Sequence, residues 1–422
     1  FKVLPFRYIS ALKHSSIHPG KVKKHVPKRK KIIINTKFKR WQSTGLYAAP
    51  GKVILVKALK SVLTRGFKIR IGCHTDNLIY MMHRQKHWRR WPELSLSKTI
   101  SKRNTLIASP HGGLIYIEVP QNDQSSEKIP FLIQGGIKAL HYKLGKTSLS
   151  SWEKQLKNTH APWGEIETKY LVISVPTKSL RKLKNPRKVA KWWDKVMNTY
   201  PKLLGSKHKN YKERFVSDVQ ISVGYMHSGY PVMTWMDQND RVIGLPTRRK
   251  KINIFKEGSW GHFHELGHNH QHRYWTPDGM VEVTCNLFTL YAMDKVLGIT
   301  PYKHTALKKA YQKIKPFFED GSNHEVFKKS FFLALAFYVK LQKQFGWKAF
   351  TRVFIQYQDL AKNQIPRTNQ QKWNQFMIRF SKVVKRNLGP YFQWWGIPVS
   401  QKALKTIARL PKWMPRNQYE EK

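Results

Sequence analysis

The residues best suited to chemistry in this chain lie in one short run, His264-Glu265-Leu266-Gly267-His268. Two histidines four positions apart project from one face of a helix, so both can bind a single metal ion. Glu265 would lie beside that metal, where its carboxylate can take a proton from water. Residues of these types at this spacing are typical of a zinc site that activates water for hydrolysis.

A site of this kind usually takes three protein ligands and leaves a fourth position to water. Glu282 is the expected third ligand: it follows the turn signal Thr276-Pro277-Asp278-Gly279, which ends the first helix and lets a second one return. Asn286 lies one helical turn beyond Glu282, so we expect it to contact a ligand rather than the metal.

The same run has a simpler interpretation, in which its polar residues form a solvated or merely hydrogen-bonded helix face. Glu282 favours the metal site, because only 24 of 422 residues are Asp or Glu and one of them stands at a third-ligand position. His262, His270 and His272 lie nearby. His268 and His272 are also four apart but lack a glutamate between them, so we expect His272 at the surface or beside the ligands.

The chain resembles the M60-like (enhancin-type) zinc metallopeptidases, gluzincins with the pattern HExxH…E, over about residues 43 to 410. More distantly, it is similar to the TRP-channel-associated factors, in which the resemblance implies a degenerate metal motif. Because this chain keeps both histidines and both glutamates, it resembles the active branch. The runs that carry the resemblance are 43–51, 71–76, 112–116, 161–165, 218–222, 226–231, 260–271, 282–288 and 345–347.

The expected mechanism uses zinc held by His264, His268 and Glu282, with Glu265 as the proton carrier. The oxyanion that forms at the scissile carbonyl needs a further donor, for which His227 and Tyr230 are both candidates. The region 226–231 has an alternative interpretation as a tight loop with packed aromatic side chains.

The resemblance implies a substrate as well, namely a peptide bond next to a serine or threonine that bears an O-linked sugar. Trp260, Asn269 and Ser228 are candidate contacts to this mucin-type glycoprotein substrate. Trp260 has an alternative role, packing beneath the helix. A glycoprotein substrate leads us to expect an extracellular or cell-surface location, although no signal peptide is visible.

Charge is the second unusual feature, since 78 Lys and Arg against 24 Asp and Glu give a net charge of +54. Such a chain attracts polyanions, among them anionic glycans and anionic membrane surfaces. Nucleic acid is not expected, because no RRM, zinc-finger or P-loop pattern is present. Solvated basic faces without a partner are the alternative. The sequence does not indicate an oligomeric state.

The pattern of hydrophobic residues predicts an α+β fold: an N-terminal β-sandwich, then a zincin-like metallopeptidase domain with a helical C-terminal subdomain. We expect a basic, disordered arm over 1–41, the sandwich over 42–158, the catalytic core over 159–300 and the helical subdomain over 301–422. An edge strand is expected over Val219–Val223, beside the metal helix. The aromatic stripe that includes Phe331, Phe332, Phe337 and Tyr338 is expected in the core.

No run approaches the roughly eighteen uninterrupted apolar residues of a membrane helix. Cys73 and Cys285 are expected to be buried free thiols rather than a disulfide. Two functions from other classes remain open beside the peptidase: a catalytically silent interaction protein like the channel-associated relatives, and a polyanion-binding protein supported only by charge.

Overall fold

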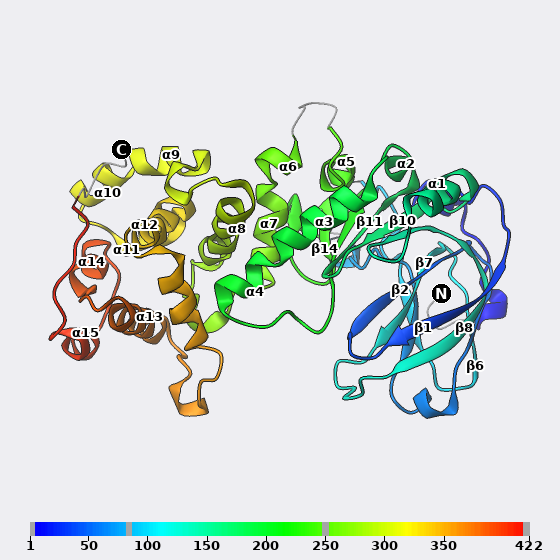
Figure 1. The fold of residues 1–422 in the computed structure, drawn as a ribbon, viewed down its shortest axis with the longest axis horizontal. Coiled ribbons are helices and arrows are strands. Elements are labelled where there is room, and N and C mark those ends of the chain that lie inside the picture. The colour runs from blue at the N-terminus through cyan, green and yellow to red at the C-terminus, as the bar shows by residue number, and fades with distance from the viewer. Residues whose placement is uncertain (1–4, 82–86, 247–252, 417–422) are drawn as a thin grey trace. The chain divides into compact units, whose positions relative to one another are not determined.

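The computed structural model describes residues 5–81, 87–246 and 253–416 (Figure 1). The chain divides into two compact units, of which the first comprises 1–194 and 209–255 and the second 195–208 and 256–422. Each unit is described by itself. The division falls at residue 255, inside the catalytic core expected over 159–300, and one excursion of the chain, 195–208, belongs to the second unit.

The N-terminal half of the first unit is a sheet of eight strands within the described residues, in the order β5-β4-β7-β2-β8-β3-β6, with β1 paired to β8. β8 joins two parts of this sheet, because residues 132–134 pair with β3 while residues 137 and 138 pair with β2. Buried residues from seven of the strands share one core. The strands are β1 Lys28–Asn35, β2 Arg40–Ala48, β3 Ile54–Lys57, β4 Lys68–Ile71, β5 Leu96–Thr99, β6 Asn104–Ile107, β7 Gly113–Val119 and β8 Lys128–Lys138.

The arm expected over residues 1–41 is contradicted in its second part. β1 pairs antiparallel with β8 along its length, as Figure 1 shows in blue and cyan. Ile32 and Ile34 point into the core, while the lysines before them stay exposed or half-buried. The basic run is therefore the beginning of a strand, in which only the last residues alternate between buried and exposed positions.

A second sheet of six strands in the described residues follows, in the order β13-β14-β12-β11-β10-β9. Three of its pairings are parallel, between β9 and β10, β11 and β12, and β12 and β14. The strands are β9 Leu140–Lys143, β10 Trp163–Glu167, β11 Leu171–Pro176, β12 Glu213–Asp218, β13 Met226–His227 and β14 Val232–Trp235. Helices α1 Leu149–Asn158, α2 Thr177–Leu180 and α5 Asn239–Val242 also belong to this unit.

The strand expected over Val219–Val223 is wrong. β12 ends at Asp218, and the two-residue strand β13 forms one edge of the sheet, with β9 at the other. Residues 219–223 are irregular, because Asp218 and Gln220 use their side chains in buried contacts: Asp218 with Arg90, and Gln220 with the backbone N–H of Arg89.

The second unit is helical within the described residues, and it confirms the helical C-terminal part of the α+β prediction. Helices α3 Pro186–Met197 and α6 Ile254–Glu257 cross the division between the units. The helices of the second unit are α4 Thr199–Leu204, α7 Trp260–His268, α8 Val281–Leu297, α9 Thr305–Gln312, α10 Ile314–Glu319, α11 His324–Lys329, α12 Phe331–Ile355, α13 Asn369–Val384, α14 Gly389–Trp394 and α15 Gln401–Ile407. Among the described residues, none of these helices has the length and hydropathy needed to cross a bilayer.

The aromatic stripe of α12 divides at its first turn. Phe337 and Tyr338 are buried as expected, but Phe331 and Phe332 are 47% and 41% exposed. The first turn of α12 therefore presents aromatic surface outside the core.

One buried ion pair holds the second sheet and leads to a stability prediction. Glu165 on β10 accepts from Arg214 on β12, from the Tyr116 hydroxyl and from the Ser174 hydroxyl, at 2.9, 2.9 and 2.8 Å. We expect Glu165→Gln to lower the free energy of unfolding by about 3–5 kcal/mol, because Arg214 would keep a buried charge without its counter-ion. Equilibrium denaturation measures this change.

The matched control removes a carboxylate that is exposed. Glu127, 53% exposed, pairs with Arg65, which keeps Asp123 as a second partner. Glu127→Gln is expected to cost about 1 kcal/mol or less. Equal losses in the two variants would show that the Arg214 pair does not hold the sheet.

Candidate metal centre

Helices α7 and α8 pack against each other along their length (Figure 1). The chain reverses between them at Pro277, whose carbonyl accepts from the N–H of Met280 at 3.0 Å. The C-terminal end of α7 and the first two turns of α8 therefore face each other. This reversal brings side chains fourteen or more residues apart in sequence to one place.

Three ligand-type atoms converge there. The Nε2 atoms of His264 and His268 are 3.0 Å apart, and the Oε2 atom of Glu282 lies 3.0 Å from the first and 3.4 Å from the second. The imidazole rings are perpendicular, with an interplanar angle of 89°. Tetrahedral zinc with ligand distances of about 2.0–2.2 Å needs ligand atoms about 3.3 Å apart. The three atoms therefore fit one divalent metal ion.

Two amides hold the imidazole rings from behind. Nδ1 of His264 lies 2.8 Å from Oδ1 of Asn286, which can only accept, so this nitrogen carries the proton and Nε2 is free to bind metal. Asn286 is fixed in turn, since its Nδ2 donates to the Glu282 carbonyl at 2.8 Å. Nε2 of Gln271 lies 2.8 Å from Nδ1 of His268, and Oε1 of Gln271 accepts from the Thr284 hydroxyl at 2.7 Å. Gln271 was not singled out from the sequence.

The electrostatics keep His268 in the form that binds metal. Burial lowers the pKa of His268, and neighbouring His264 lowers it further, against the opposing effect of Glu282. The imidazole is therefore neutral at physiological pH. A neutral imidazole is the form that coordinates a cation.

Cys285 is a fourth ligand-type residue at this cluster. Its Sγ atom is 3.5 Å from Nδ1 of His264, the nitrogen that faces Asn286. Burial raises the pKa of the Cys285 thiol, and the carboxylates of Glu282 and Glu265 raise it further. The thiol is closer to Nδ1 of His264 than to the metal-binding Nε2, at 3.5 Å against 4.0 Å. Cys285 and Cys73 are both buried and free.

Glu265 lies in α7 between the two histidines, and it is 7% exposed. It directly follows His264 in α7 and precedes His268 by three residues, so it lies next to the helix face that carries the two histidines. The arrangement thus offers a three-atom metal site with a further carboxylate close by.

Comparison with known proteins identifies the family. The profile described as "Peptidase M60, enhancin and enhancin-like" matches residues 135–396, and the N-terminal domain of M60-like peptidases matches residues 26–132. The chain belongs to the peptidase M60 family.

Curated relatives of this M60 protein are named TRPM8 channel-associated factors. TRPM8 channel-associated factor 2 of Homo sapiens is 35% identical over 376 residues, 88% of this chain and 40% of its own length. TRPM8 channel-associated factor 1 of Homo sapiens is also 35% identical, over 88% of this chain and 39% of its own. The chain therefore spans about two fifths of the length of these curated relatives. The resemblance to the channel-associated factors, expected to be the more distant one, is thus 35% identity over 88% of this chain.

Solved structures share the fold. The ZmpB metallopeptidase from Clostridium perfringens superposes with a TM-score of 0.67 at 18% identity, covering 92% of this chain and 82% of its own. IMPa from Pseudomonas aeruginosa in complex with an O-glycopeptide gives 0.67 at 15%, covering 92% and 52%. A functionally unknown conserved protein from Bacillus anthracis str. Ames gives 0.73 at 19%, covering 92% and 80%. The family implies a metal cofactor, which the donor set between α7 and α8 fits.

The remaining residues predicted for the site fall in both units of the M60 chain. Trp260 begins α7 and packs against His304 and Phe332, with ring centroids 4.9 and 5.8 Å away. Asn269 caps the C-terminal end of α7. His270 is half-buried and packs its ring against Tyr200 and Phe288, with centroids 4.8 and 6.2 Å away.

His227, Ser228 and Tyr230 belong to the first unit. Nε2 of His227 lies 2.8 Å from Oδ2 of Asp76, and its Nδ1 lies 2.9 Å from the Ser228 carbonyl. Burial alone would raise the pKa of Asp76, but the hydrogen bonds from His227 and Ser222 outweigh it and lower the pKa. The Tyr230 hydroxyl accepts from Nε of Arg214 at 3.3 Å.

A second group of ligand-type side chains, His18, His74 and Asp218, is buried in the first unit. Asp218 already lies 2.9 Å from Nε of Arg90, with His18 3.3 Å away on the other oxygen. Burial lowers the pKa of His74 to about 3, so this imidazole is neutral. Because Arg90 balances the carboxylate, the group is explained as a buried polar network without a cation.

Gly267 was not singled out from the sequence, yet it sets the approach of the two helices. A Cβ atom at this position would lie 2.3 Å from the Cys285 carbonyl oxygen. We expect Gly267→Ala to push α7 away from α8, which lowers metal affinity and the melting temperature together. Metal titration and thermal unfolding of the same sample measure both.

Cys285→Ala is the matched control, because it removes the neighbouring thiol and keeps the carbonyl that the new Cβ would meet. It is expected to retain metal affinity. Unchanged metal binding in Gly267→Ala would contradict the role of the close approach. Lost binding in Cys285→Ala would instead make the thiol a ligand.

Proposed function

We propose that this chain is a zinc-dependent endopeptidase that cleaves peptide bonds in O-glycosylated, mucin-like proteins. One observation carries the proposal: in a member of the peptidase M60 family, His264, His268 and Glu282 converge within 3.4 Å of one another beside the buried Glu265. The donor set of two imidazoles and a carboxylate is the one that zinc takes in peptidases of this type.

Each side chain has a separate role in the proposed hydrolysis. When bound, zinc would supply Lewis-acid activation of water and of the scissile carbonyl. Asn286 holds His264 with its Nε2 toward the metal site. Glu265 takes the proton from water as the water attacks, and then passes it to the leaving amine.

A second donor for the developing oxyanion stays a prediction, with His227 and Tyr230 as candidates. The side chain of His227 is 20% exposed, with its Nε2 2.8 Å from Oδ2 of Asp76 and its Nδ1 2.9 Å from the Ser228 carbonyl. Tyr230 is packed between Trp41 and Tyr211, with its hydroxyl against Arg214.

The glycoprotein substrate is supported by the fold neighbours. The structure of IMPa with an O-glycopeptide and that of IMPa with T-antigen concern a protein of this fold. In this chain, Trp260 and Phe332 line a hollow of about 440 Å³ with His304, Thr305 and Lys309. Aromatic faces of this kind suit a sugar ring, and Asn269 and Ser228 remain candidate contacts. A substrate of this class would place the protein outside the cell or at its surface.

The test compares intact mucin with enzymatically deglycosylated mucin, each with and without a chelator. Chelator-sensitive cleavage limited to the glycosylated form is the expected result. Equal cleavage of the two forms would overturn the substrate class while leaving a metallopeptidase. Cleavage that survives complete metal removal would overturn the reaction.

A second candidate function rests on the relatives' names. The 35% identity to TRPM8 channel-associated factors favours a catalytically silent protein that presents the same fold to a channel. Metal bound at one equivalent without any Glu265-dependent cleavage, together with binding to purified TRPM8, would favour this function over the peptidase.

A further inference from the structure

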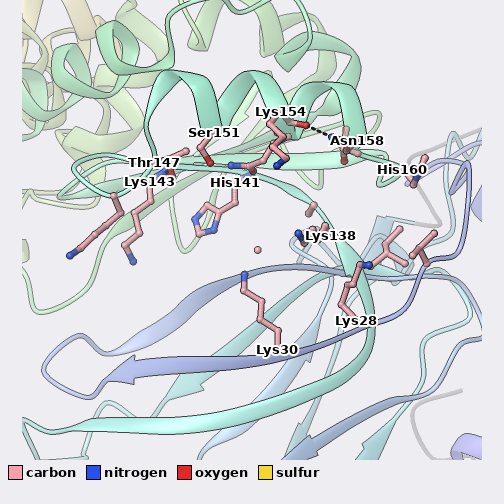
Figure 2. Close-up of a pocket in the computed structure, with 17 residues that line it drawn as sticks. Lys28, Lys30, Lys138, His141, Lys143, Thr147, Ser151, Lys154, Asn158 and His160 are labelled. Atoms are coloured by element: carbon pink, nitrogen blue, oxygen red, sulfur yellow. Dashed lines mark hydrogen bonds between the residues drawn. The ribbon is translucent and has the colours of Figure 1, made fainter.

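The first unit contains a cavity of about 730 Å³ between β1, the β8–β9 segment and helix α1. Figure 2 shows Lys28 and Lys30 rising from β1 on one side, with Ser151, Lys154 and Asn158 on α1 at the other. None of the described residues that line it is acidic, whereas two are histidines, His141 and His160. Its lysines are Lys28, Lys30, Lys138, Lys143, Lys146 and Lys154.

Carboxylates do not balance this charge. Glu167, behind the lining, lies 2.8 Å from His141, 2.9 Å from Lys143 and 2.6 Å from Lys212, so one carboxylate serves three basic groups. Across the described ranges, the remaining lysines of the cavity form no ion pair. The cavity therefore concentrates positive charge beyond the general excess of the chain.

Lys30 responds to this field. Burial lowers the pKa of Lys30, and Lys138 and Lys143 lower it further. Its Nζ donates to the Thr44 carbonyl at 2.8 Å, which orients the ammonium without neutralising it. An anion in the cavity would stabilise the charged form.

Gly45 leaves open the space between Lys30 and His141. A Cβ atom on Gly45 would lie 3.0 Å from Nδ1 of His141 and 3.2 Å from Nζ of Lys30. Gly45 has φ +68°, a conformation that also favours glycine. In Figure 2 the side chains of Lys30 and His141 point toward each other across this space.

We propose that this cavity binds a sugar-sized polyanion that carries two or more phosphate or sulfate esters. Ammonium groups that approach from β1, β8 and α1 can each meet a different ester, and charge-assisted hydrogen bonds to such oxyanions are strong. Thr147, Ser151 and Asn158 add neutral hydrogen-bonding groups for ring hydroxyls. The volume lies in the range of small-molecule sites. This site is separate from the metal centre and does not depend on the proposed peptidase activity.

Calorimetric titration with two probes tests the proposal on the full chain at about 0.15 M salt, where long-range attraction is screened. Inositol hexakisphosphate supplies phosphate esters, sucrose octasulfate supplies sulfate esters, and myo-inositol is the neutral control. One equivalent of at least one probe is expected to bind, with no heat from myo-inositol. The probe that binds more tightly identifies the ester.

Paired variants locate the site. Lys138 and Lys154 are exposed at the rim, so Lys138→Gln with Lys154→Gln leaves the fold intact and is expected to weaken binding about tenfold or more. Lys178→Gln with Lys184→Gln removes the same charge from exposed positions outside the cavity and is expected to change affinity less than twofold. Lys30→Gln, tested separately, should weaken binding as well.

Three results would overturn the proposal. An equal loss of probe affinity in the two double variants would show that the probes bind through the general positive charge of the chain. Several equivalents bound per chain would do the same. Binding to vesicles containing phosphatidylinositol bisphosphate that free inositol hexakisphosphate does not compete would assign the lysines to a membrane surface instead.

Discussion

Glu265→Gln is expected to lower kcat on a glycosylated substrate by about 10²–10⁴-fold while the chain keeps one equivalent of metal. Glutamine preserves the size of the side chain but cannot carry the proton from water to the leaving amine. The metal stays bound because His264, His268 and Glu282 are untouched. Steady-state kinetics and metal analysis of the same preparation measure the two quantities.

Glu319→Gln is the matched control, since it makes the same charge change on a side chain that is 61% exposed in the same unit. It should leave kcat unchanged. Full activity in Glu265→Gln would show that Glu265 does not carry the proton. Loss of metal in that variant would mean that Glu265 is a ligand.

Glu282→Ala and Asn286→Ala are expected to weaken metal binding to different degrees. Asn286→Ala removes the acceptor that holds Nδ1 of His264, and such a change costs about 10–100-fold in affinity. Glu282→Ala removes a ligand atom that lies 3.0 Å from Nε2 of His264, so its loss should be larger. Competition against a chromogenic chelator ranks the two variants.

Which variant loses more metal affinity tests the assignment of the third ligand. A larger loss in Asn286→Ala would make the amide, rather than the carboxylate, the third ligand. Equal affinity in both variants and in the unchanged chain would place the metal elsewhere.

The metal cluster was predictable because its geometry is local. Spacing of four on α7 and a turn before α8 determine where His264, His268 and Glu282 point, and one further helical turn determines Asn286. Gln271 and Gly267 were not predicted, because their roles depend on how the two helices approach. A glycine inside a helix was the one available signal, since it costs about 1 kcal/mol against alanine and usually has a packing reason.

The fold was predicted where hydrophobic periodicity is strong and missed where tertiary contacts override it. β1 was not predicted because its first four residues, Lys28 to Lys31, are basic and exposed or half-buried, without an apolar alternation. Val219–Val223 alternates like a strand, yet buried polar contacts of Asp218 and Gln220 end β12 before it. Phe331 and Phe332 follow the helical stripe of α12 but lie on its first, exposed turn.

X-ray absorption at the zinc edge tests the central claim most directly. The account predicts one zinc per chain, bound by two imidazole nitrogens and a carboxylate oxygen at about 2.0–2.2 Å, with no sulfur at about 2.3 Å. The signal should disappear in His264→Ala. A chain that binds no zinc when supplied with it, or a zinc with a sulfur ligand from Cys285, would contradict the account.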